Sequence, residues 1–438
     1  MRQFLKFTLA SFLGSLTAMI IAGLFAFIIL LGMISLLSVE EEVTVNSNSI
    51  LEIKLNYEIP ERAEFKAVPD FINMIPKISR KPGLDDLIKS IKAAGNDERI
   101  KGIYLNLNGA VIGSYSNVEA LIRALQDFKQ SGKPILAYGS TISQKAFYLS
   151  SIADKLFIAP EGIIEWKGLS VELTFFKKAF DKLGIEAQIF KAGKYKSAVE
   201  PFELTSMSKE SKAQLKSLID NTYENMLINI SGAKGVAKDD LKKYADNMEL
   251  INPQTAYEAK LVDSLIYPAE FSELLKSKFG SKFSKIGISK YSKTVNESYS
   301  KNRIAVIYAD GTILQGEGND NGIITDEALS AEIRKATNND KIKAIVLRVN
   351  SPGGDALASD LIWNEIEEAK KKKPVIASFG SVAASGGYYI ACAADTIVSE
   401  PTCVTGSIGV FGFIPNIEKF MDEKLGITFD RVKTSPHA

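Results

Sequence analysis

A serine lies in a glycine-rich turn between a predicted strand and a predicted helix. Residues 379–389 read FGSVAASGGYY and follow the apolar run 374–377. Serine hydroxyls act as nucleophiles in covalent catalysis, and the glycines Gly386 and Gly387 leave room for a substrate backbone. The first N–H groups of a helix have no partner within the helix and favour a developing negative charge. The pattern therefore predicts either a nucleophilic Ser385 or a tight turn in which Ser385 caps the helix.

A second glycine-rich segment lies upstream of the serine turn. Residues 350–355 read NSPGGD and follow a strand-like apolar run. An X-Pro turn followed by glycines exposes backbone N–H groups, so Gly354 suits one half of an oxyanion hole and Gly386 the other, with Gly353 in support. The alternative is a plain β-turn. The presence of Ser385 in the same part of the chain favours the oxyanion hole.

A nucleophilic serine needs a base, and the sequence holds a single histidine, His437, next to its last residue. This histidine is a poor candidate because a catalytic histidine must be held in a packed site. Lysine can serve instead when burial lowers its pKa from about 10.4. The run 371–373 is excluded because solvated lysines stay charged, whereas Lys196, in residues 193–201 (GKYKSAVEP), lies among small residues where a strand ends. Spacing alone leaves a surface lysine as the alternative.

The composition argues against several other classes of site. Charged residues make up 24% of the chain and the net charge is +1, so no basic surface for nucleic acid is expected. The two cysteines, Cys392 and Cys403, have neither C-x-x-C spacing nor a neighbouring histidine, so we predict no zinc site and no other metal or cofactor. Two buried thiols are expected there, with a single disulfide in an oxidising compartment as the alternative.

The N-terminal part of the chain has the pattern of a membrane anchor. Residues 7–39 are uncharged and mostly apolar, and about 20 such residues span a bilayer as a helix. Arg2 and Lys6 precede this stretch, so the positive-inside rule places residues 1–6 in the cytoplasm. Everything after Val39 then lies on the other side of the membrane. A cleavable signal peptide is the alternative, but its apolar core is normally about 7–15 residues long. We therefore predict an uncleaved anchor over residues 7–39.

Beyond the anchor the chain contains two copies of one pattern. Residues 100–108 (IKGIYLNLN) match residues 342–350 (IKAIVLRVN), and residues 133–137 (KPILA) match residues 373–377 (KPVIA), at a nearly constant offset. Within each copy, strand-like apolar runs alternate with helical patterns, which favours βαβ units and a largely parallel sheet. The predicted fold class is α/β, with two tandem βαβ units behind one N-terminal transmembrane helix.

The repeat defines the predicted domain boundaries. The first unit covers residues 47–285 and ends in a mainly helical extension, and a linker rich in Ser and Lys follows over residues 286–302. The second unit covers residues 303–438 and stops where the helical extension of the first begins, so we expect it to be truncated. Gln144 stands in the first unit where Ser385 stands in the second. The chemistry is therefore expected in the second unit.

The most specific motifs of the chain are YKSAVEPF at residues 195–202, SPGG at 351–354, ASGGYY at 384–389 and TGSIGV at 405–410. Through these motifs the sequence resembles the family of signal peptide peptidase A, also called protease IV, in its long, internally duplicated bacterial form. The resemblance covers essentially everything after the anchor. It implies a serine protease whose fold is related to the Clp protease and crotonase group.

The resemblance also implies roles for particular residues. In the duplicated family the nucleophilic serine comes from the second unit, which maps it to Ser385, and the general-base lysine comes from the first unit, which maps it to Lys196. It further suggests that Ser407 helps to orient Lys196, at a position where the first unit has Trp166. The active site is then expected at the interface of the two units.

The family further implies a location, a substrate and an assembly. These are the bacterial inner membrane with the catalytic part on the periplasmic side, cleaved signal peptides and similar apolar peptides, and a homotetrameric bowl that opens towards the membrane. Two alternatives stay open, a non-catalytic membrane scaffold of the same fold and an acyl-transfer enzyme on a crotonase-like scaffold. The retained Ser385 and Lys196 count against the scaffold, and the anchor counts against the acyl-transfer enzyme.

Overall fold

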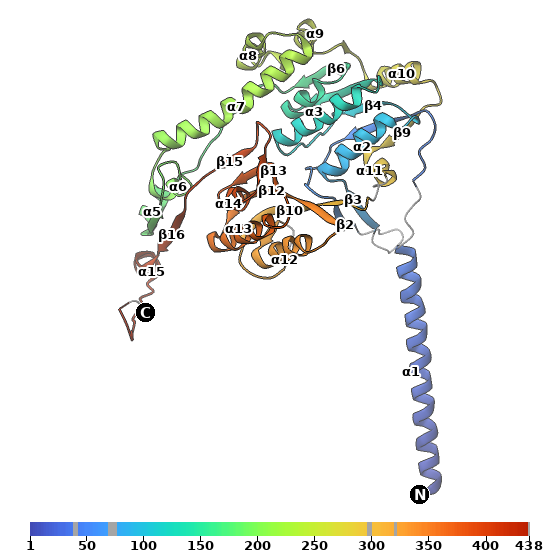
Figure 1. The fold of residues 1–438 in the computed structure, drawn as a ribbon, viewed down its shortest axis with the longest axis vertical. Helices are drawn as coiled ribbons and strands as arrows, with labels where there is room; N and C mark the ends of the chain where they lie inside the picture. Colours follow the sequence, from blue (N-terminus) through green and yellow to red (C-terminus); the bar gives the residue numbers. More distant parts are fainter. Residues whose placement is uncertain (38–42, 69–76, 296–299, 319–321, 437–438) are drawn as a thin grey trace. The chain divides into compact units, whose positions relative to one another are not determined.

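The structure is a computed structural model that describes residues 1–37, 43–68, 77–295, 300–318 and 322–436. Contacts between Cα atoms divide the chain into two compact units. The smaller unit comprises residues 1–45 and 65–81, and the larger one comprises residues 46–64 and 82–438. Figure 1 shows both units as one ribbon.

The smaller unit holds one long helix and a pair of short strands. Helix α1 runs over Arg2–Leu37, and β2 (Glu64–Val68) pairs with β3 (Lys77–Lys81). Over Arg2–Ile28, α1 is long and apolar enough to cross a membrane by length and composition, and its residues there are exposed. The chain therefore has the predicted N-terminal helix as a candidate membrane span. Residues 38–39 of the predicted anchor lie outside the described residues.

The first repeat is built on a parallel sheet. Its strands lie in the order β8-β6-β5-β4-β1-β9, and each is parallel to its neighbours. The strands are β1 (Ser49–Lys54), β4 (Ile100–Asn106), β5 (Ile135–Ile142), β6 (Lys155–Ile164), β8 (Ser264–Leu265) and β9 (Ser284–Gly287). The crossover helices are α2 (Leu84–Asn96), α3 (Tyr115–Lys129) and α4 (Gln144–Ser150). Strands covered by such helices are mostly buried, which explains their nearly continuous apolar runs.

A mainly helical extension follows β6 within the first repeat. It comprises α5 (Lys177–Leu183), β7 (Glu186–Lys191), α6 (Glu200–Glu203), α7 (Lys209–Lys234), α8 (Lys238–Asp246), η1 (Glu249–Ile251), α9 (Pro253–Glu258) and α10 (Pro268–Phe279). In Figure 1, α7 is the long green helix of this extension. Ser208 caps the N-terminus of α7 by accepting the Ser211 N–H, and Gly235 ends the helix in a left-handed conformation.

The segment predicted as the linker begins inside the first repeat. Strand β9 pairs with β1 at the edge of the sheet, and α11 (Ile288–Tyr291) and η2 (Ser292–Thr294) follow it. Tyr291 is buried, and its hydroxyl donates to Asp97 Oδ2 at 3.1 Å. The expected boundary at residue 286 falls within β9 because a four-residue edge strand carries too little alternation to be recognised. Residues 296–299 lie outside the described residues.

The second repeat has a parallel sheet of the same design. Its strands lie in the order β11-β10-β12-β13-β14, and β15 also pairs with β13. The strands are β10 (Arg303–Leu314), β11 (Ile323–Thr325), β12 (Ile342–Gly354), β13 (Val375–Ala384), β14 (Thr396–Val398) and β15 (Val404–Gly406). The helices are α12 (Asp326–Thr337), α13 (Ala356–Lys370) and α14 (Gly386–Cys392), and one buried apolar cluster packs between the helices and the sheet. β16 (Phe411–Asn416) and α15 (Glu418–Leu425) follow.

Equivalent side chains hold the strands in both repeats. Asn108 Oδ1 accepts a backbone N–H of β5 at 2.8 Å, and Asn350 Oδ1 accepts the equivalent N–H of β13 at 3.1 Å. Asp154 and Asp395 accept the first N–H of the same two strands, each at 2.8 Å. The predicted α/β class is confirmed. Residues that align between the two copies also make equivalent hydrogen bonds.

Candidate active site

Ser385 is itself the turn between strand β13 and helix α14. β13 ends at Ala384 and α14 begins at Gly386. The serine backbone has φ 53° and ψ −119°, outside the regions that residues other than glycine favour. Its N–H donates to the Gly406 carbonyl and its carbonyl accepts from the Tyr389 N–H, both at 2.9 Å. A serine on such a strained strand-to-helix turn presents its hydroxyl at the end of the sheet.

Three glycines allow the backbone to approach this serine. A Cβ atom on Gly353 would lie 2.5 Å from the Gly386 nitrogen and 2.8 Å from the Ser385 Cβ. A Cβ atom on Gly386 would lie 3.2 Å from the Gly354 nitrogen, and one on Gly354 would lie 2.0 Å from the Ile313 carbonyl oxygen. Larger residues cannot fit without moving the backbone. The two N–H groups expected to hold an oxyanion therefore lie in one close-packed cluster beside the serine.

The predicted turn at residues 350–355 is the end of a strand in the structure. β12 continues through Gly354, and both of its terminal glycines pair with β10. Ser351 is buried, and its Oγ accepts the Gly353 N–H at 3.1 Å. Proline and glycine suggested a turn, but pairing with β10 keeps the segment extended. Because the sheet is parallel, the glycines still reach the edge at which β13 ends.

Lys196 reaches Ser385 from the first repeat. It is 2% exposed, and its Nζ lies 3.0 Å from Ser385 Oγ, 2.6 Å from the Ser407 carbonyl oxygen and 3.0 Å from Ser407 Oγ. Burial lowers the pKa of Lys196 below its ordinary value of 10.5. The structure thus brings Lys196 to two serines that lie 189 and 211 residues later in the sequence, and the surface position considered for Lys196 is wrong.

A two-stranded antiparallel ribbon carries Lys196 to the second repeat. β7, in the first repeat, pairs with β16, which follows the second sheet. Phe413 lies opposite Ile189 in this pairing, and its ring stacks on Phe202 with centroids 4.7 Å apart. Lys196 follows β7 closely, and Ser407 closely precedes β16. The ribbon therefore brings the two segments that meet at Ser385 into register.

The loop that carries Lys196 is tied to the start of helix α7. Gln214 Nε2 donates to Ser197 Oγ at 2.7 Å. The N–H and the hydroxyl of Ser208 donate to the buried Glu200 carboxylate at 3.1 and 2.6 Å. The sequence analysis assigned no role to Glu200, although it lies in the motif around Lys196. Its partner is Ser208, the residue that caps α7, and this contact is visible only in the structure.

An open cavity of about 600 Å³ lies over these groups. Ser385, Lys196, Gly354 and Gly386 line one part of it. Its apolar wall comes from Tyr388, Tyr389, Ile408, Val410 and Phe411, and the Phe411 ring centroid lies 5.8 Å from Lys196 Nζ. The volume is typical of ligand sites. A serine hydroxyl, a buried lysine amine, glycine backbone and an apolar wall are thus present in one place.

The two cysteines of the second repeat are not joined to each other. Within the ranges that the structure describes, no group of three or more His, Cys, Asp or Glu side chains could hold a metal ion. Both cysteines are free thiols, so the alternative of a disulfide is not realised. Cys403 is buried as predicted, whereas Cys392 is exposed and lines the cavity, because α14 turns its last residue outward.

Tandem parallel α/β repeats with a serine between strand and helix define a Clp-protease-like class of protein. The family model described as Clp protease matches residues 296–402, and the model described as Peptidase family S49 matches residues 127–280 and 367–438. The chain belongs to peptidase family S49. The family resemblance inferred from the sequence motifs is therefore confirmed.

Similar proteins are named as proteases. The chain is 36% identical to "Protease 4" of Haemophilus influenzae, over 82% of the chain and 60% of that protein. It is 36% identical to "Protease 4" of Salmonella typhi, over 81% of the chain and 59% of that protein. It is also 36% identical to "Serine protease SPPA, chloroplastic" of Arabidopsis thaliana, over 81% of the chain and 54% of that protein. The chain thus spans 60% or less of the length of these relatives.

Proposed function

We propose that this chain is a serine endopeptidase in which Ser385 is the nucleophile and Lys196 is the general base. The observation that carries the proposal is the 3.0 Å separation between Lys196 Nζ and Ser385 Oγ. Membership of peptidase family S49 and the protease names of its relatives support the same reaction class. Lys196 takes the part that histidine plays in a Ser-His-Asp triad.

The hydrogen bonds of Lys196 suit a neutral amine. A neutral amine has two N–H groups and one lone pair, and the two acceptors on Ser407 can take both N–H groups. The lone pair is then left for the hydroxyl proton of Ser385. Because burial lowers the lysine pKa, a larger fraction of the amine is neutral at a given pH. Ser407 is a positioning residue in this arrangement.

The reaction proceeds through an acyl-enzyme. Ser385 Oγ attacks the peptide carbonyl carbon while its proton moves to Lys196 Nζ, and the backbone N–H groups of Gly354 and Gly386 donate to the oxyanion. The C–N bond then breaks, and the lysine ammonium returns the proton to the leaving amine. Water next attacks the ester, Lys196 takes the water proton, and that proton passes to Ser385 Oγ as the ester bond breaks. The products are a free carboxylate and a free amine.

The proposed substrate, location and assembly rest on the resemblance to the family and on the apolar cavity wall. Apolar peptides, including cleaved signal peptides, suit an apolar cleft. Helix α1 anchors the protein in the bacterial inner membrane, with the catalytic part on the periplasmic side. A homotetramer is the proposed assembly. Sedimentation of the full chain in nanodiscs or detergent measures the number of copies in the assembly. A monomer would contradict the proposed homotetramer.

Labelling with a serine-reactive fluorophosphonate tests the proposed chemistry. The wild-type chain should be labelled at Ser385, and Ser385→Ala and Lys196→Ala should both lose the label. Lys145→Ala is a matched control, because Lys145 is a lysine of the first repeat whose pKa burial also lowers. It should retain the label. Thermal unfolding of each variant establishes that it is folded.

The same experiment separates the proposed function from the alternatives. Labelling that survives in folded Ser385→Ala would exclude Ser385 as the nucleophile. A folded wild-type chain that takes no label would favour a non-catalytic scaffold. Labelling together with saturable binding of an acyl-coenzyme A would favour the acyl-transfer enzyme.

A further inference from the structure

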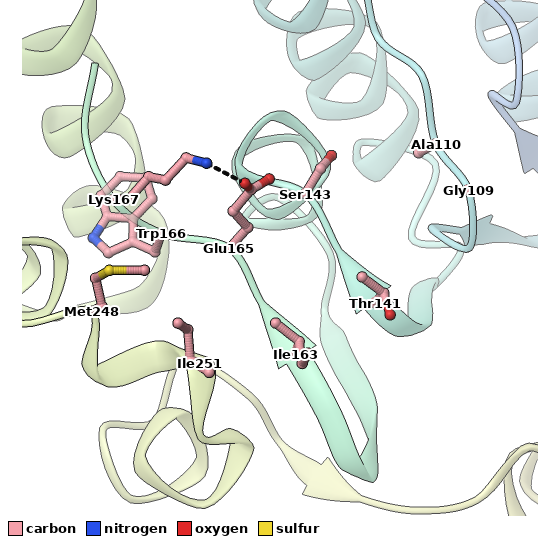
Figure 2. A pocket seen from close by; sticks show the side chains of 10 residues that line it. All are labelled: Gly109, Ala110, Thr141, Ser143, Ile163, Glu165, Trp166, Lys167, Met248 and Ile251. Carbon is pink, nitrogen blue, oxygen red and sulfur yellow. Dashed lines mark hydrogen bonds and ion pairs between the residues drawn. The ribbon is translucent and has the colours of Figure 1, made fainter. Parts of the chain in front are cut away.

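A loop, residues 399–403, separates strands β14 and β15 of the second repeat. In the first repeat the corresponding residues belong to one strand, β6, which pairs with β5 on both sides of a shift in register. Figure 2 shows Thr141 of β5 and Ile163 of β6, which pair with each other, at the wall of a pocket of about 470 Å³. In the second repeat Val404 stands at the position of Ile163 and pairs with Val382 of β13. The interruption of the strand thus distinguishes the second repeat from the first.

A glycine of β6 explains why the second repeat takes a different path. A Cβ atom on Gly162 would lie 2.6 Å from the Ser140 carbonyl oxygen and 2.9 Å from the Ala159 carbonyl oxygen. Cys403 stands at the position of Gly162 in the register of the two repeats, and it is buried. Its N–H donates to the Glu400 carbonyl at 3.1 Å, which closes a turn. A residue with a side chain therefore ends the strand where the glycine lets it continue.

Helix α3 of the first repeat holds this loop through a buried carboxylate. Glu119 is 5% exposed, and its Oε2 accepts the Thr402 hydroxyl at 2.9 Å. Its Oε1 accepts the Tyr148 hydroxyl at 3.4 Å, and Asn229 Nδ2 of α7 donates to that hydroxyl at 2.5 Å. Ser116 Oγ also lies 3.4 Å from Thr402 Oγ1. A helix of the first repeat thus contacts a buried threonine of the second.

Two contacts at the edge of the loop accompany this one. Arg123, one turn after Glu119 on α3, pairs with Glu400, and its Nη1 lies 2.6 Å from Oε2. Asn221 Nδ2 of α7 donates to the Pro401 carbonyl at 2.8 Å. Exposed contacts of this kind contribute little to stability. Together with Thr402, however, they give three consecutive residues of the loop a partner in the first repeat.

The loop leads directly to the groups proposed for catalysis. β15 follows it, is three residues long and pairs with β13. Its last residue, Gly406, accepts the Ser385 N–H at 2.9 Å. The next residue, Ser407, supplies both acceptors for Lys196 Nζ. A strand with so few hydrogen bonds is easily displaced, so its position depends on the contacts at its two ends.

Stability alone does not explain a carboxylate at this place. Removing a carboxylate from water costs free energy that hydroxyl partners return only in part. Burial accordingly raises the pKa of Glu119, against the smaller opposite effect of the Thr402 hydroxyl. An apolar side chain of similar size would be buried at lower cost. A fully partnered buried group can instead specify one relative position of the segments that it joins.

We propose that Glu119 is a positioning residue for the reaction, which acts through Thr402 to hold β15 and Ser407 against Lys196. The inference rests on the proposed function, because the groups that it positions are the proposed nucleophile and base. Without its partner, Thr402 releases the start of β15 and Ser407 moves away from the lysine amine. Water then reaches the amine, its pKa rises towards the ordinary value of 10.5, and a smaller fraction is neutral.

The rate of fluorophosphonate labelling tests this proposal, measured on the full chain in nanodiscs against probe concentration and pH. In Glu119→Leu and Thr402→Val we expect the limiting rate at neutral pH to fall about tenfold, because a displaced base slows the reaction. The half-saturating probe concentration should stay unchanged. The pH at which the rate levels off should move towards 10.5. Glu119→Gln should label like the wild type, because its amide keeps an oxygen for the threonine hydroxyl.

Tyr291→Phe is the matched control. It also removes a hydroxyl that donates to a carboxylate, Asp97 Oδ2 at 3.1 Å, from a buried residue of the segment that follows β9. Thermal unfolding should show a loss of stability similar to that of Thr402→Val. Its labelling rate and pH profile should nevertheless equal those of the wild type, because this hydroxyl does not hold the loop.

The outcomes separate this inference from the proposed function. Folded Glu119→Leu and Thr402→Val chains that label like the wild type, or that lose rate without a shift in the pH profile, overturn the positioning role and leave the catalytic proposal intact. A folded wild-type chain that takes no label contradicts the catalytic proposal. Hydrogen exchange of residues 399–407 then decides whether Glu119 holds β15, since exchange should be faster in Glu119→Leu and not in Tyr291→Phe. Unchanged exchange in Glu119→Leu would overturn the inference.

Discussion

The two repeats share a frame, by which we mean their parallel strands, their crossover helices and the side-chain contacts that hold these together. They differ in the residues at the end of the sheet. In the first, Lys133 Nζ donates to the Ala94 and Asp97 carbonyls at the end of α2, both at 2.8 Å. In the second, Lys373 Nζ donates to two carbonyls at the end of α12, at 2.8 and 2.6 Å. Together with the paired asparagines and aspartates, these lysines fix the turns between helices and strands. Such contacts are needed for folding whether or not a repeat carries out chemistry.

The repeats diverge at the place where the second one carries Ser385. Gln144 replaces the serine, and Trp166 replaces Ser407 and packs on Phe147 and Tyr223 instead of contacting a lysine. At the position of Ser407 the first repeat thus has an aromatic side chain, Trp166, that packs against Tyr223 of its helical extension. In return, that extension supplies Lys196 to the second repeat. The proposed site is thus divided between the two units, and five sets of substitutions test this division, from the largest expected effect to the smallest.

Placing the first repeat's residue in the second should abolish turnover. Ser385→Gln removes the proposed nucleophile, and we expect kcat for an apolar peptide to fall by about 10⁴-fold or more. The reciprocal change, Gln144→Ser, should create no second labelled site, because Lys196 serves the other repeat. Mass spectrometry of the fluorophosphonate adduct checks both. A label on the serine introduced by Gln144→Ser would show that the first repeat needs only a serine to react.

Glycine at position 353 should be indispensable, in contrast to a glycine of the first repeat. Gly353→Ala puts a Cβ atom 2.5 Å from the Gly386 nitrogen, so we expect a loss of about 3 kcal/mol in stability and of most activity. Gly109 has φ 64° but nothing within 4 Å of an added Cβ atom, so Gly109→Ala should cost about 1–2 kcal/mol and leave kcat unchanged. Urea unfolding and peptide hydrolysis measure these effects, and equal losses would contradict the comparison.

Ser407→Ala should impair the reaction without preventing binding. It removes the 3.0 Å contact between Ser407 Oγ and Lys196 Nζ and leaves the carbonyl as the acceptor. A less well-oriented base should lower kcat by about 10²-fold with KM nearly unchanged. Ser399→Ala is the control, since the Ser399 hydroxyl contacts the Glu400 carbonyl instead. A rise in KM alone would place Ser407 in substrate binding.

Activity should follow the protonation of Lys196. Under the proposed dyad the neutral amine is the base, so kcat/KM should rise about tenfold per pH unit up to the lysine pKa, which burial lowers from 10.5, and then level off. Between the lowered pKa of the folded state and 10.5, the unfolded chain binds more protons at this group, so its contribution to stability increases with pH. Lys196→Met should remove both dependences. A flat pH profile of the wild type would argue against lysine as the base.

The shared frame should respond equally in both repeats. Lys133→Met and Lys373→Met each remove two hydrogen bonds to helix-end carbonyls, and we expect each to cost about 1–2 kcal/mol. Lys372→Met, which removes an exposed contact to Asn338, should cost about 0.5 kcal/mol or less. Thermal unfolding measures all three. A large difference between Lys133 and Lys373 would show that the frame is not equivalent.

The frame was predictable from the sequence because it depends on local patterns that occur twice. Apolar runs indicated the strands, and the motifs at Ser385 and Gly353 marked the end of the sheet where a site can form. Lysine as the base could be argued from the absence of a well-placed histidine, but only the family resemblance singled out Lys196. Its burial depends on the pairing of β7 with β16, two short strands far apart in the chain, which no local pattern specifies.

Two further features lie beyond sequence patterns for the same reason. The positive φ of Ser385 is imposed by hydrogen bonds to Gly406 and Tyr389, because serine alone does not favour that conformation. The position of Trp166 suggested a lost contact to lysine, and only the fold shows that its ring packs under the extension. Both features depend on residues distant in the sequence. Aligning the two repeats identifies the positions that differ, but it does not give the backbone conformation or the packing at those positions.

The pairing of β7 with β16 also orders events during synthesis. The ribosome adds about 5–20 residues per second, and Lys196 precedes its partner serine by 189 residues. Under the proposed dyad, the base is therefore made before the serine that it activates. Under the proposed function, hydrolysis needs the second repeat in place and β16 paired with β7.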